Sequence, residues 1–300
     1  MKPNRLLKQL ALTTGLMVFS MHSFAVEVTE KFNGMTINAN LELVNDNDYS
    51  GPVVLLTHGT LTHSGRSTYK QLQNNLKAKG ISSIAPNLSL GVDNRHGEYD
   101  CAVPHTHKHT DALNEIGFWL DWLKAKGAEN ITLMGHSRGG NQTAWFAHKN
   151  DSDKFQKVVL IAPATGGQQD HAEFEEKYGT SMSDLLKQAN AKIAAGNGDE
   201  LMKVKGFIYC KDTSASAAAI VDYYTIKPEF DTPTLLKSAT KPTLVVTGDS
   251  DTVVADLPEK IAPLVDAGKI QTVEIADADH FFLDFASEDL AAEAADFINQ

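Results

Sequence analysis

The segment GHSRG at residues 135–139 is the part of this sequence that most clearly indicates chemistry. An apolar run at residues 131–134 precedes it, and residues 143–148 can continue as a helix. A serine in a G-x-S-x-G pattern between a strand and a helix is typical of a nucleophile elbow, a sharp turn that presents the hydroxyl above a sheet. The glycines at both ends fit that turn, because a Cβ there would crowd it. Ser137 is therefore the predicted nucleophile.

A serine hydroxyl attacks well only when a nearby base takes its proton and a carboxylate orients that base. Two loops downstream supply such groups. Residues 248–254 hold Asp249 and Asp251, and residues 276–282 hold His280. Both loops follow apolar segments that are predicted to be parallel strands, whose carboxyl ends gather functional groups at one edge of an α/β sheet. The order Ser, Asp, His along the chain is the one expected with this elbow.

The elements that must position these groups alternate along the chain. Strands are expected at residues 27–32, 35–44, 53–57, 81–85, 131–134, 158–161, 243–247 and 270–275. Helices are expected at residues 67–79, 111–126, 143–148, 257–267 and 287–298. Such alternation indicates an α/β protein with a mostly parallel central sheet and helices on both faces.

Residues 165–240 interrupt this alternation. They show no convincing buried strand and are interpreted as helices at residues 170–177, 182–195 and 214–224. A helical insertion beside the active edge of a sheet is a candidate lid, and a structural subdomain without motion is the alternative. Its aromatic side chains could line a pocket or form the insertion's own core: Phe207, Tyr209, Tyr223, Tyr224 and Phe230.

Together these features resemble the α/β-hydrolase superfamily, in particular its lidded serine esterases, lipases and thioesterases. The residues that carry the resemblance are GHSRG at 135–139, the loop from Gly248 to Asp251, Asp279-His280 and His58-Gly59. It implies an α/β-hydrolase core at residues 26–164 and 241–300, with an inserted helical lid at residues 165–240.

The resemblance also implies a role for each candidate residue. Ser137 matches the nucleophile, and His280 matches the general base that later acts as acid. Asp251 matches the orienting acid, because the related G-x-x-D loop carries its carboxylate three residues after the glycine. Asp249 is the alternative. Asp277 and Asp279 are expected to cap a turn before the last helix.

An acyl-transfer intermediate needs preorganised N–H donors for its oxyanion. One is expected to be the backbone of Arg138, which follows the nucleophile. The resemblance places the second at Thr60, with Leu61 as the alternative. The Arg138 side chain could bind an acidic substrate group, although a solvated side chain is the favoured reading. His58 and His136 are expected to brace loops rather than react.

The loop at residues 96–109 gathers four histidines, two acids and a cysteine. An H-x-H-x-H run can bind zinc or copper. The fixed C-x-x-C and H-E-x-x-H frameworks are absent from the sequence, so a polar loop at the mouth of the pocket is favoured and no metal site is predicted.

The first 25 residues are predicted to be a cleaved signal peptide. Three basic residues precede an apolar run of about ten residues, too short to span a bilayer of about 30 Å, and Ser23-Phe24-Ala25 offers a cleavage site. An uncleaved N-terminal anchor is the alternative. Export to the periplasm or the medium makes a Cys101–Cys210 disulfide plausible, with two separate buried thiols as the other possibility.

Charge and motifs limit the partners. The net charge is −11, and removing the basic leader makes it about −14; such a surface repels nucleic acid and anionic lipid, so neither partner is expected, nor is stable membrane insertion after cleavage. No nucleotide or flavin motif is present, and no cofactor is expected.

The favoured function is hydrolysis of a small-molecule ester or thioester. The same triad acting on an amide, peptide or C–C bond is one alternative, and a binding protein on a hydrolase scaffold is another. The sequence leaves the oligomeric state open.

Overall fold

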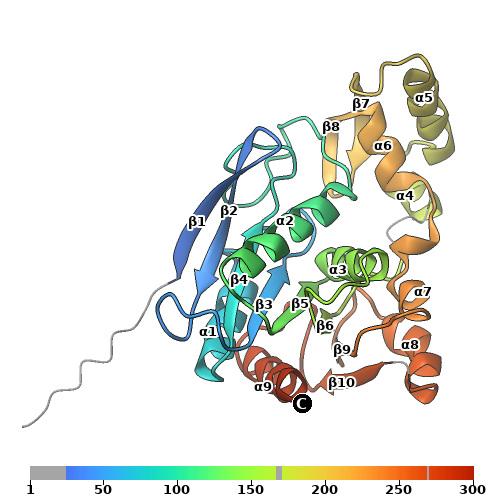
Figure 1. The fold of residues 1–300 in the computed structure, drawn as a ribbon. Coiled ribbons are helices and arrows are strands. Elements are labelled where there is room, and N and C mark those ends of the chain that lie inside the picture. The colour runs from blue at the N-terminus through green and yellow to red at the C-terminus, as the bar shows by residue number, and fades with distance from the viewer. Residues whose placement is uncertain (1–24, 167–170, 269) are drawn as a thin grey trace, which may run out of the picture.

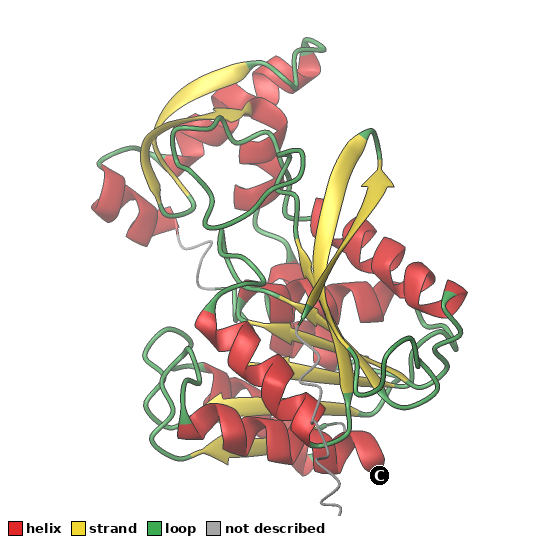
Figure 2. Ribbon diagram, turned by 90° about the vertical axis from the view of Figure 1, so that its left-hand side faces the viewer, coloured by secondary structure: helices red, strands yellow, loops and turns green. Residues whose placement is uncertain are grey.

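The computed structural model describes residues 25–166, 171–268 and 270–300. The predicted signal peptide therefore lies outside the described residues, apart from Ala25. An eight-stranded sheet crosses the molecule in the order β1-β2-β4-β3-β5-β6-β9-β10, with helices packed on both of its faces (Figures 1 and 2). The predicted fold class is confirmed.

The strands of this sheet lie close to where the sequence pattern placed them. Their bounds are β1 Val26–Phe32, β2 Met35–Glu42, β3 Val53–Thr57, β4 Ser82–Asn87, β5 Ile131–His136, β6 Lys157–Ile161, β9 Thr243–Gly248 and β10 Gln271–Ile275. The β1–β2 hairpin and the β2–β4 pair are antiparallel, and every pair from β4 to β10 is parallel. Pro86 does not end its strand, since it pairs with Ala39 inside β4.

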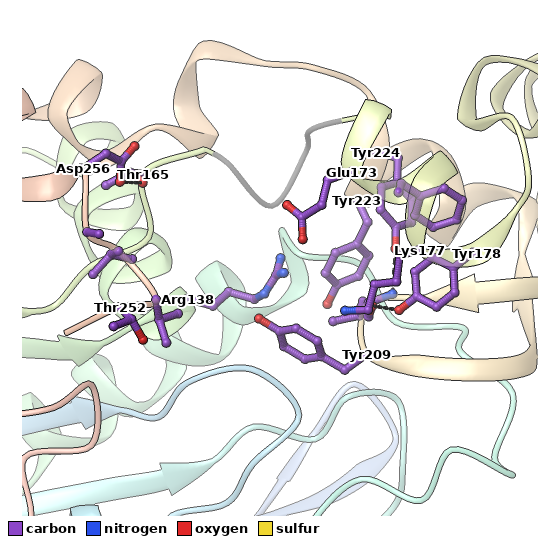
Figure 3. A pocket seen from close by; sticks show the side chains of 15 residues that line it. Arg138, Thr165, Glu173, Lys177, Tyr178, Tyr209, Tyr223, Tyr224, Thr252 and Asp256 are labelled. Atoms are coloured by element: carbon purple, nitrogen blue, oxygen red, sulfur yellow. Dashed lines mark hydrogen bonds between the residues drawn. The ribbon is translucent and has the colours of Figure 1, made fainter.

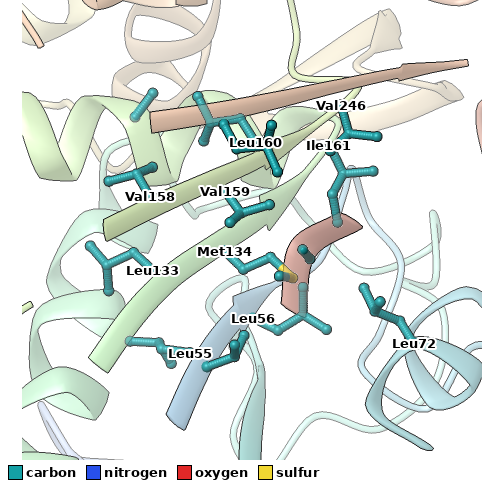
Figure 4. Close-up of a cluster of buried hydrophobic side chains, with 14 of the residues drawn as sticks. Leu55, Leu56, Leu72, Leu133, Met134, Val158, Val159, Leu160, Ile161 and Val246 are labelled. Carbon is teal, nitrogen blue, oxygen red and sulfur yellow. The ribbon is translucent and has the colours of Figure 1, made fainter. Parts of the chain in front are cut away.

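The helices that cover the sheet are α1 Ser67–Ala78, α2 Asp111–Ala125, α3 Arg138–Lys149, α8 Leu257–Asp266 and α9 Phe285–Asn299. The central strands β3, β5 and β6 are buried almost throughout, as expected for parallel strands covered on both faces. Leu55, Leu133, Met134 and Val159 pack together there and fix the strand that leads into the predicted elbow (Figure 4).

Between β6 and β9 the chain forms a separate layer with its own apolar core. We call residues 171–224 the cap. It contains α4 His171–Tyr178, α5 Met182–Ala194, β7 Leu201–Phe207, β8 Cys210–Ser216 and α6 Ala217–Tyr224, and it is followed by a short η2 Pro228–Phe230 and α7 Thr232–Leu236. In Figure 1 the cap lies above α3, on the upper right.

The prediction that residues 165–240 contain helices and turns but no buried strand was wrong for residues 201–216. These residues form the antiparallel β7–β8 hairpin, and the helix expected from Ser214 begins only at Ala217, with Ser216 as its N-cap. No strand was predicted here because only every second residue of β7 is buried: Met202 and Val204 alternate with exposed lysines. A half-buried strand has no continuous apolar run.

Three kinds of contact fasten the cap to the loop after β4. Cys101 and Cys210 form a disulfide. His105 pairs with the β8 strand through two backbone hydrogen bonds, from its N–H to Ser214 O at 2.8 Å and from Ser216 N–H to its carbonyl at 2.9 Å. Thr213 Oγ1 donates to the Cys101 carbonyl at 2.8 Å. The hairpin is therefore joined to the core covalently and by main-chain pairing.

Candidate active site

Ser137 stands on a strained turn between β5 and α3. Its backbone has φ 57° and ψ −125°, a conformation that a non-glycine residue seldom adopts. The flanking glycines leave room for the turn. A Cβ at Gly135 would overlap the carbonyl oxygen of Gly139, and a Cβ at Gly139 would overlap that of His58. The local geometry is that of a nucleophile elbow.

The structure brings Ser137, His280 and Asp251 into one hydrogen-bonded chain. His280 Nε2 lies 2.9 Å from Ser137 Oγ, and His280 Nδ1 lies 2.8 Å from Asp251 Oδ2. In a neutral imidazole this requires Nδ1–H to donate to the carboxylate and Nε2 to accept from the serine hydroxyl. The three residues follow the ends of the parallel strands β5, β9 and β10, and β6 lies between β5 and β9 in the sheet.

Asp251 is held ready to accept from His280. Its other oxygen, Oδ1, accepts from the backbone N–H groups of Val253 at 2.7 Å and Val254 at 3.2 Å. Burial raises the pKa of this carboxyl, but the hydrogen bond and the charge of His280 and the two backbone N–H groups lower it more, so the pKa lies below its usual value. Asp251 is therefore ionised at neutral pH.

The alternative acid, Asp249, does not reach the histidine. Its Oδ1 accepts from the neighbouring Ser250 hydroxyl at 3.0 Å, and its side chain is exposed. Asp279 caps its own turn, as expected, by accepting from Phe281 N–H at 2.8 Å. The geometry thus favours Asp251 over Asp249.

A second hydrogen-bonded chain runs behind the first. His136 Nε2 lies 2.7 Å from the carbonyl oxygen of His280, so Nε2–H must donate to it. His136 Nδ1 then accepts from the Tyr69 hydroxyl at 2.9 Å, and the Tyr69 oxygen accepts from Gly59 N–H at 2.7 Å. Burial, with repulsion from His280, lowers the pKa of His136 to about 3, so this ring stays neutral.

This second chain was only partly visible in the sequence. His136 was expected to brace a loop, and it braces the His280 loop. Tyr69 lies within the helix that was expected at residues 67–79, and nothing in its spacing indicates that its hydroxyl lies beside Gly59. His58 also braces, as expected: its Nδ1–H donates to Gly59 O at 2.9 Å and its Nε2 accepts from Leu88 N–H at 3.0 Å.

The predicted oxyanion donors lie on two loops that touch. Arg138 Nε donates to Thr60 Oγ1 at 3.0 Å, which joins the start of α3 to the loop after β3. The first N–H groups of a helix have no partner within the helix, and Arg138 is the first residue of α3. Leu61, the alternative to Thr60, has a φ of 53°. The choice between Thr60 and Leu61 stays a prediction.

A family model described as Hydrolase_4, serine aminopeptidase, S33, matches residues 50–282, a span that contains both chains of hydrogen bonds. The chain belongs to this family. The predicted membership of the α/β-hydrolase superfamily is thereby confirmed, and the protein is a hydrolase by family. Comparison with curated protein sequences gives no match.

Solved structures show the same fold over nearly the whole chain. Est1E from Butyrivibrio proteoclasticus is 18% identical, with a TM-score of 0.59 over 91% of this chain and 97% of its own. A thioesterase domain from the curacin biosynthetic pathway is 17% identical, with a TM-score of 0.59 over 93% and 100%. The esterase domain of a Rhodothermus marinus protein is 15% identical, with a TM-score of 0.56 over 92% and 100%. At these identities the likeness establishes the fold.

In this Hydrolase_4 member three residues of the histidine-rich loop are buried, whereas a polar loop at the mouth of the pocket was expected. His105, His107 and His109 are 0%, 2% and 1% exposed. His107 bonds to His105 at 3.2 Å and to the Tyr223 hydroxyl at 2.9 Å. The bridge to β8 carries these rings under the cap, which the sequence alone could not indicate. Within the described ranges, no group of three or more potential ligand side chains is placed to hold a metal ion.

Arg138 also differs from expectation. Its side chain is only 9% exposed rather than solvated. The guanidinium bonds to Thr60 Oγ1 and to His109 Nδ1, at 3.3 Å, and lies over the Tyr223 ring at 5.3 Å from the centroid. The residue after the predicted nucleophile therefore directs a fixed positive charge toward the cap.

A pocket of about 450 Å³ lies between the cap and the core, where it is lined by Arg138, the residue after Ser137, and by Thr252, the residue after Asp251 (Figure 3). Tyr209, Tyr223 and Tyr224 line it, whereas Phe207 and Phe230 are buried in the cores of the cap and the main domain. The aromatic residues thus divide between the two roles considered for them.

Of the helices described here, none is both long and apolar enough to cross a membrane.

Proposed function

We propose that this protein is an exported serine hydrolase that cleaves a carboxylic ester or thioester of a small molecule through an acyl-enzyme. The observation that carries the proposal is the hydrogen-bonded chain from Ser137 Oγ through His280 to Asp251, in a member of a hydrolase family. The strained elbow and the adjoining pocket support it, because a nucleophile needs both exposure to substrate and a place for the substrate to lie.

In the proposed reaction His280 Nε2 takes the Ser137 proton as Oγ attacks the carbonyl carbon. Asp251 keeps its charge and stabilises the imidazolium. The negative oxygen of the tetrahedral intermediate accepts from the backbone N–H groups of Arg138 and of Thr60 or Leu61. His280 then protonates the leaving alcohol or thiol. A water molecule, deprotonated by His280, cleaves the acyl ester and releases the acid. The sequence of steps uses no cofactor.

A second candidate is the same triad acting on an amide or peptide bond. The matched family is described as serine aminopeptidase, an activity on peptide bonds, and this description supports the second candidate. Amide cleavage needs better protonation of the leaving nitrogen than ester cleavage does, because an amine anion is a far poorer leaving group. The same residues would carry out both reactions, so only the relative rates separate them.

The test compares the hydrolysis of p-nitrophenyl esters, an acyl thioester and aminoacyl p-nitroanilides by the wild type and Ser137→Ala. We expect esters or thioesters to be the better substrates and the variant to lose at least about 10⁴-fold in kcat. Ser183→Ala, on the exposed surface of α5, is the matched control and should keep full activity. Faster cleavage of the anilides would favour the amide reading, and full activity of Ser137→Ala would exclude Ser137 as nucleophile.

Export is proposed on two grounds. The N-terminal sequence has the basic, apolar and small-residue regions of a signal peptide, and the Cys101–Cys210 disulfide suits an oxidising compartment. The intact mass of protein expressed in a bacterial host and recovered outside the cytoplasm should correspond to a chain that begins at Val26, less two thiol hydrogens. A full-length mass, or one with both hydrogens present, would count against cleavage or against the disulfide.

A further inference from the structure

The pocket beside Ser137 has walls from two parts of the chain, and its position ties it to the proposed reaction. Arg138, one residue after the predicted nucleophile, and Thr252, one residue after Asp251, line it from the core. The opposite wall comes from α4, the β7–β8 turn and α6 of the cap (Figure 3). A substrate whose carbonyl meets Ser137 would extend into this space.

The cap wall is aromatic, and three of its rings are fixed by their own hydroxyls. The Tyr178 hydroxyl donates to Ile208 O at 2.9 Å, the Tyr224 oxygen accepts from Ile208 N–H at 2.6 Å, and the Tyr223 hydroxyl bonds to His107 Nδ1 at 2.9 Å. Because their polar tips are occupied, these residues offer the pocket mainly ring surface. A preorganised aromatic wall favours a flat ring, which stacks on it at little entropic cost.

The charges in the wall select among ring substituents. Lys177 Nζ lies over the rings of Tyr178 and Tyr209, 5.5 and 5.4 Å from their centroids, and Arg138 lies over Tyr223. Each of these three rings therefore already has a cation of the protein beside it, so a cationic ligand at this wall would meet like charge.

The lining of the pocket also contains two acidic residues. Asp256 forms an ion pair with Lys260 at 2.9 Å, while Glu173 points into the space from α4 (Figure 3). Among the described residues, no carboxylate forms an ion pair with the Lys177 ammonium, which lies on the exposed side of α4. With the Asp256 charge offset, two cations face one acid, in a chain whose net charge is −11.

We propose that this pocket binds an aromatic ring that carries an anionic substituent on the side remote from the ester, with the ring against the tyrosine wall and the anion facing Lys177. The assignment to one side of an ester rests on the proposed function. The substrate class is then an ester or thioester with an anionic aromatic group, rather than a plain alkyl chain.

The experiment uses four methyl esters of one length: 3-arylpropanoates with a para carboxylate, a para methyl or a para trimethylammonio group, and the cyclohexyl analogue of the carboxylate. Binding to Ser137→Ala is measured by calorimetry, and kcat/KM is measured with the wild type. The anionic aromatic ester should be preferred over the methyl compound by about fivefold, an advantage that shrinks at high salt. It should also be preferred over its cyclohexyl analogue.

Variants separate the charge from the fold. Lys177→Met should bring the ratio of kcat/KM for the carboxylate ester to kcat/KM for the methyl ester down to about one, and Lys177→Arg should restore the wild-type ratio. Lys187→Met removes the same charge from the exposed surface of α5, outside the pocket, and should change nothing.

The possible failures can be told apart. Equal or tighter binding of the cationic ester, or of the cyclohexyl ester, would overturn the substrate class while hydrolysis of any of the four leaves the proposed function intact. Binding of the anionic aromatic ester to Ser137→Ala without hydrolysis of any ester by the wild type would refute the function and keep the pocket assignment.

Discussion

At the scale of single residues, His280 is held from two directions. Asp251 bonds to its ring, and His136 bonds to its backbone carbonyl. The second contact continues through Tyr69 to Gly59, in the loop expected to donate to the oxyanion. One buried tyrosine hydroxyl therefore connects the loop of the proposed base with the loop of the proposed oxyanion donor. It accepts a hydrogen bond from Gly59 N–H and donates one to His136 Nδ1.

Tyr69→Phe tests this connection. The change leaves Gly59 N–H and His136 Nδ1 without their partner, which should cost about 1–3 kcal/mol in the free energy of unfolding. Because it also loosens both catalytic loops, kcat for an ester should fall about tenfold with KM nearly unchanged. Tyr49→Phe, at a partly buried tyrosine that packs against Trp122, is the control. An unaltered kcat together with the full loss of stability would mean that Tyr69 is only structural.

At the scale of elements, the seam between the cap and the loop after β4 buries three neutral histidines. Burial lowers the pKa of His105 to about 4 and lowers those of His107 and His109 well below 6.5. In the unfolded chain these rings titrate near 6.5. The unfolded state therefore binds more protons below that pH, and stability must fall as the pH drops from 6.5 toward the folded pKa values.

His105→Phe isolates one part of this acid sensitivity. His105 Nε2 has no partner among the described residues, and the ring stacks on Tyr99 at 4.7 Å, so a phenyl ring should fit. Between about pH 4 and 6.5 the slope of unfolding free energy against pH should decrease by up to about 1.4 kcal/mol per pH unit. His96→Gln is the control, because the hydrogen bond that His96 donates to Glu27 raises the pKa of His96 and gives a pH dependence of the opposite sign. Denaturant titrations over this range would contradict the account if His105→Phe kept the wild-type slope.

The same seam shows where sequence reasoning stops. Ser137, Asp251 and His280 could be found because each follows a predicted parallel strand, and parallel strands bring their carboxyl ends to one edge of the sheet whatever chain lies between them. The burial of His105 and Arg138 could not be found. It depends on the cap: the β7–β8 hairpin pairs with the loop of His105, and the Arg138 guanidinium lies over Tyr223 of α6. The sequence pattern predicted no strand at residues 201–216. Tyr69 shows the same limit, since its burial on a helix was visible and its hydroxyl partners were not.

At the scale of the whole molecule, the sheet and the cap perform separate tasks. The sheet core holds the proposed reacting groups after the ends of β5, β9 and β10. The cap adds the aromatic and charged wall of the pocket and is held to the core by a disulfide and a backbone bridge. Chemistry and selectivity are therefore expected to respond to different substitutions, with Ser137 governing the first and Lys177 the second.

The most direct test of the central claim is reaction of the folded protein with a fluorophosphonate, followed by peptide mass analysis. Such a reagent phosphonylates a serine hydroxyl that a neighbouring base activates. The account predicts one labelled residue, Ser137, with labelling lost in Ser137→Ala and strongly slowed in His280→Ala. Absence of labelling in a folded sample, or labelling at another serine, would contradict it.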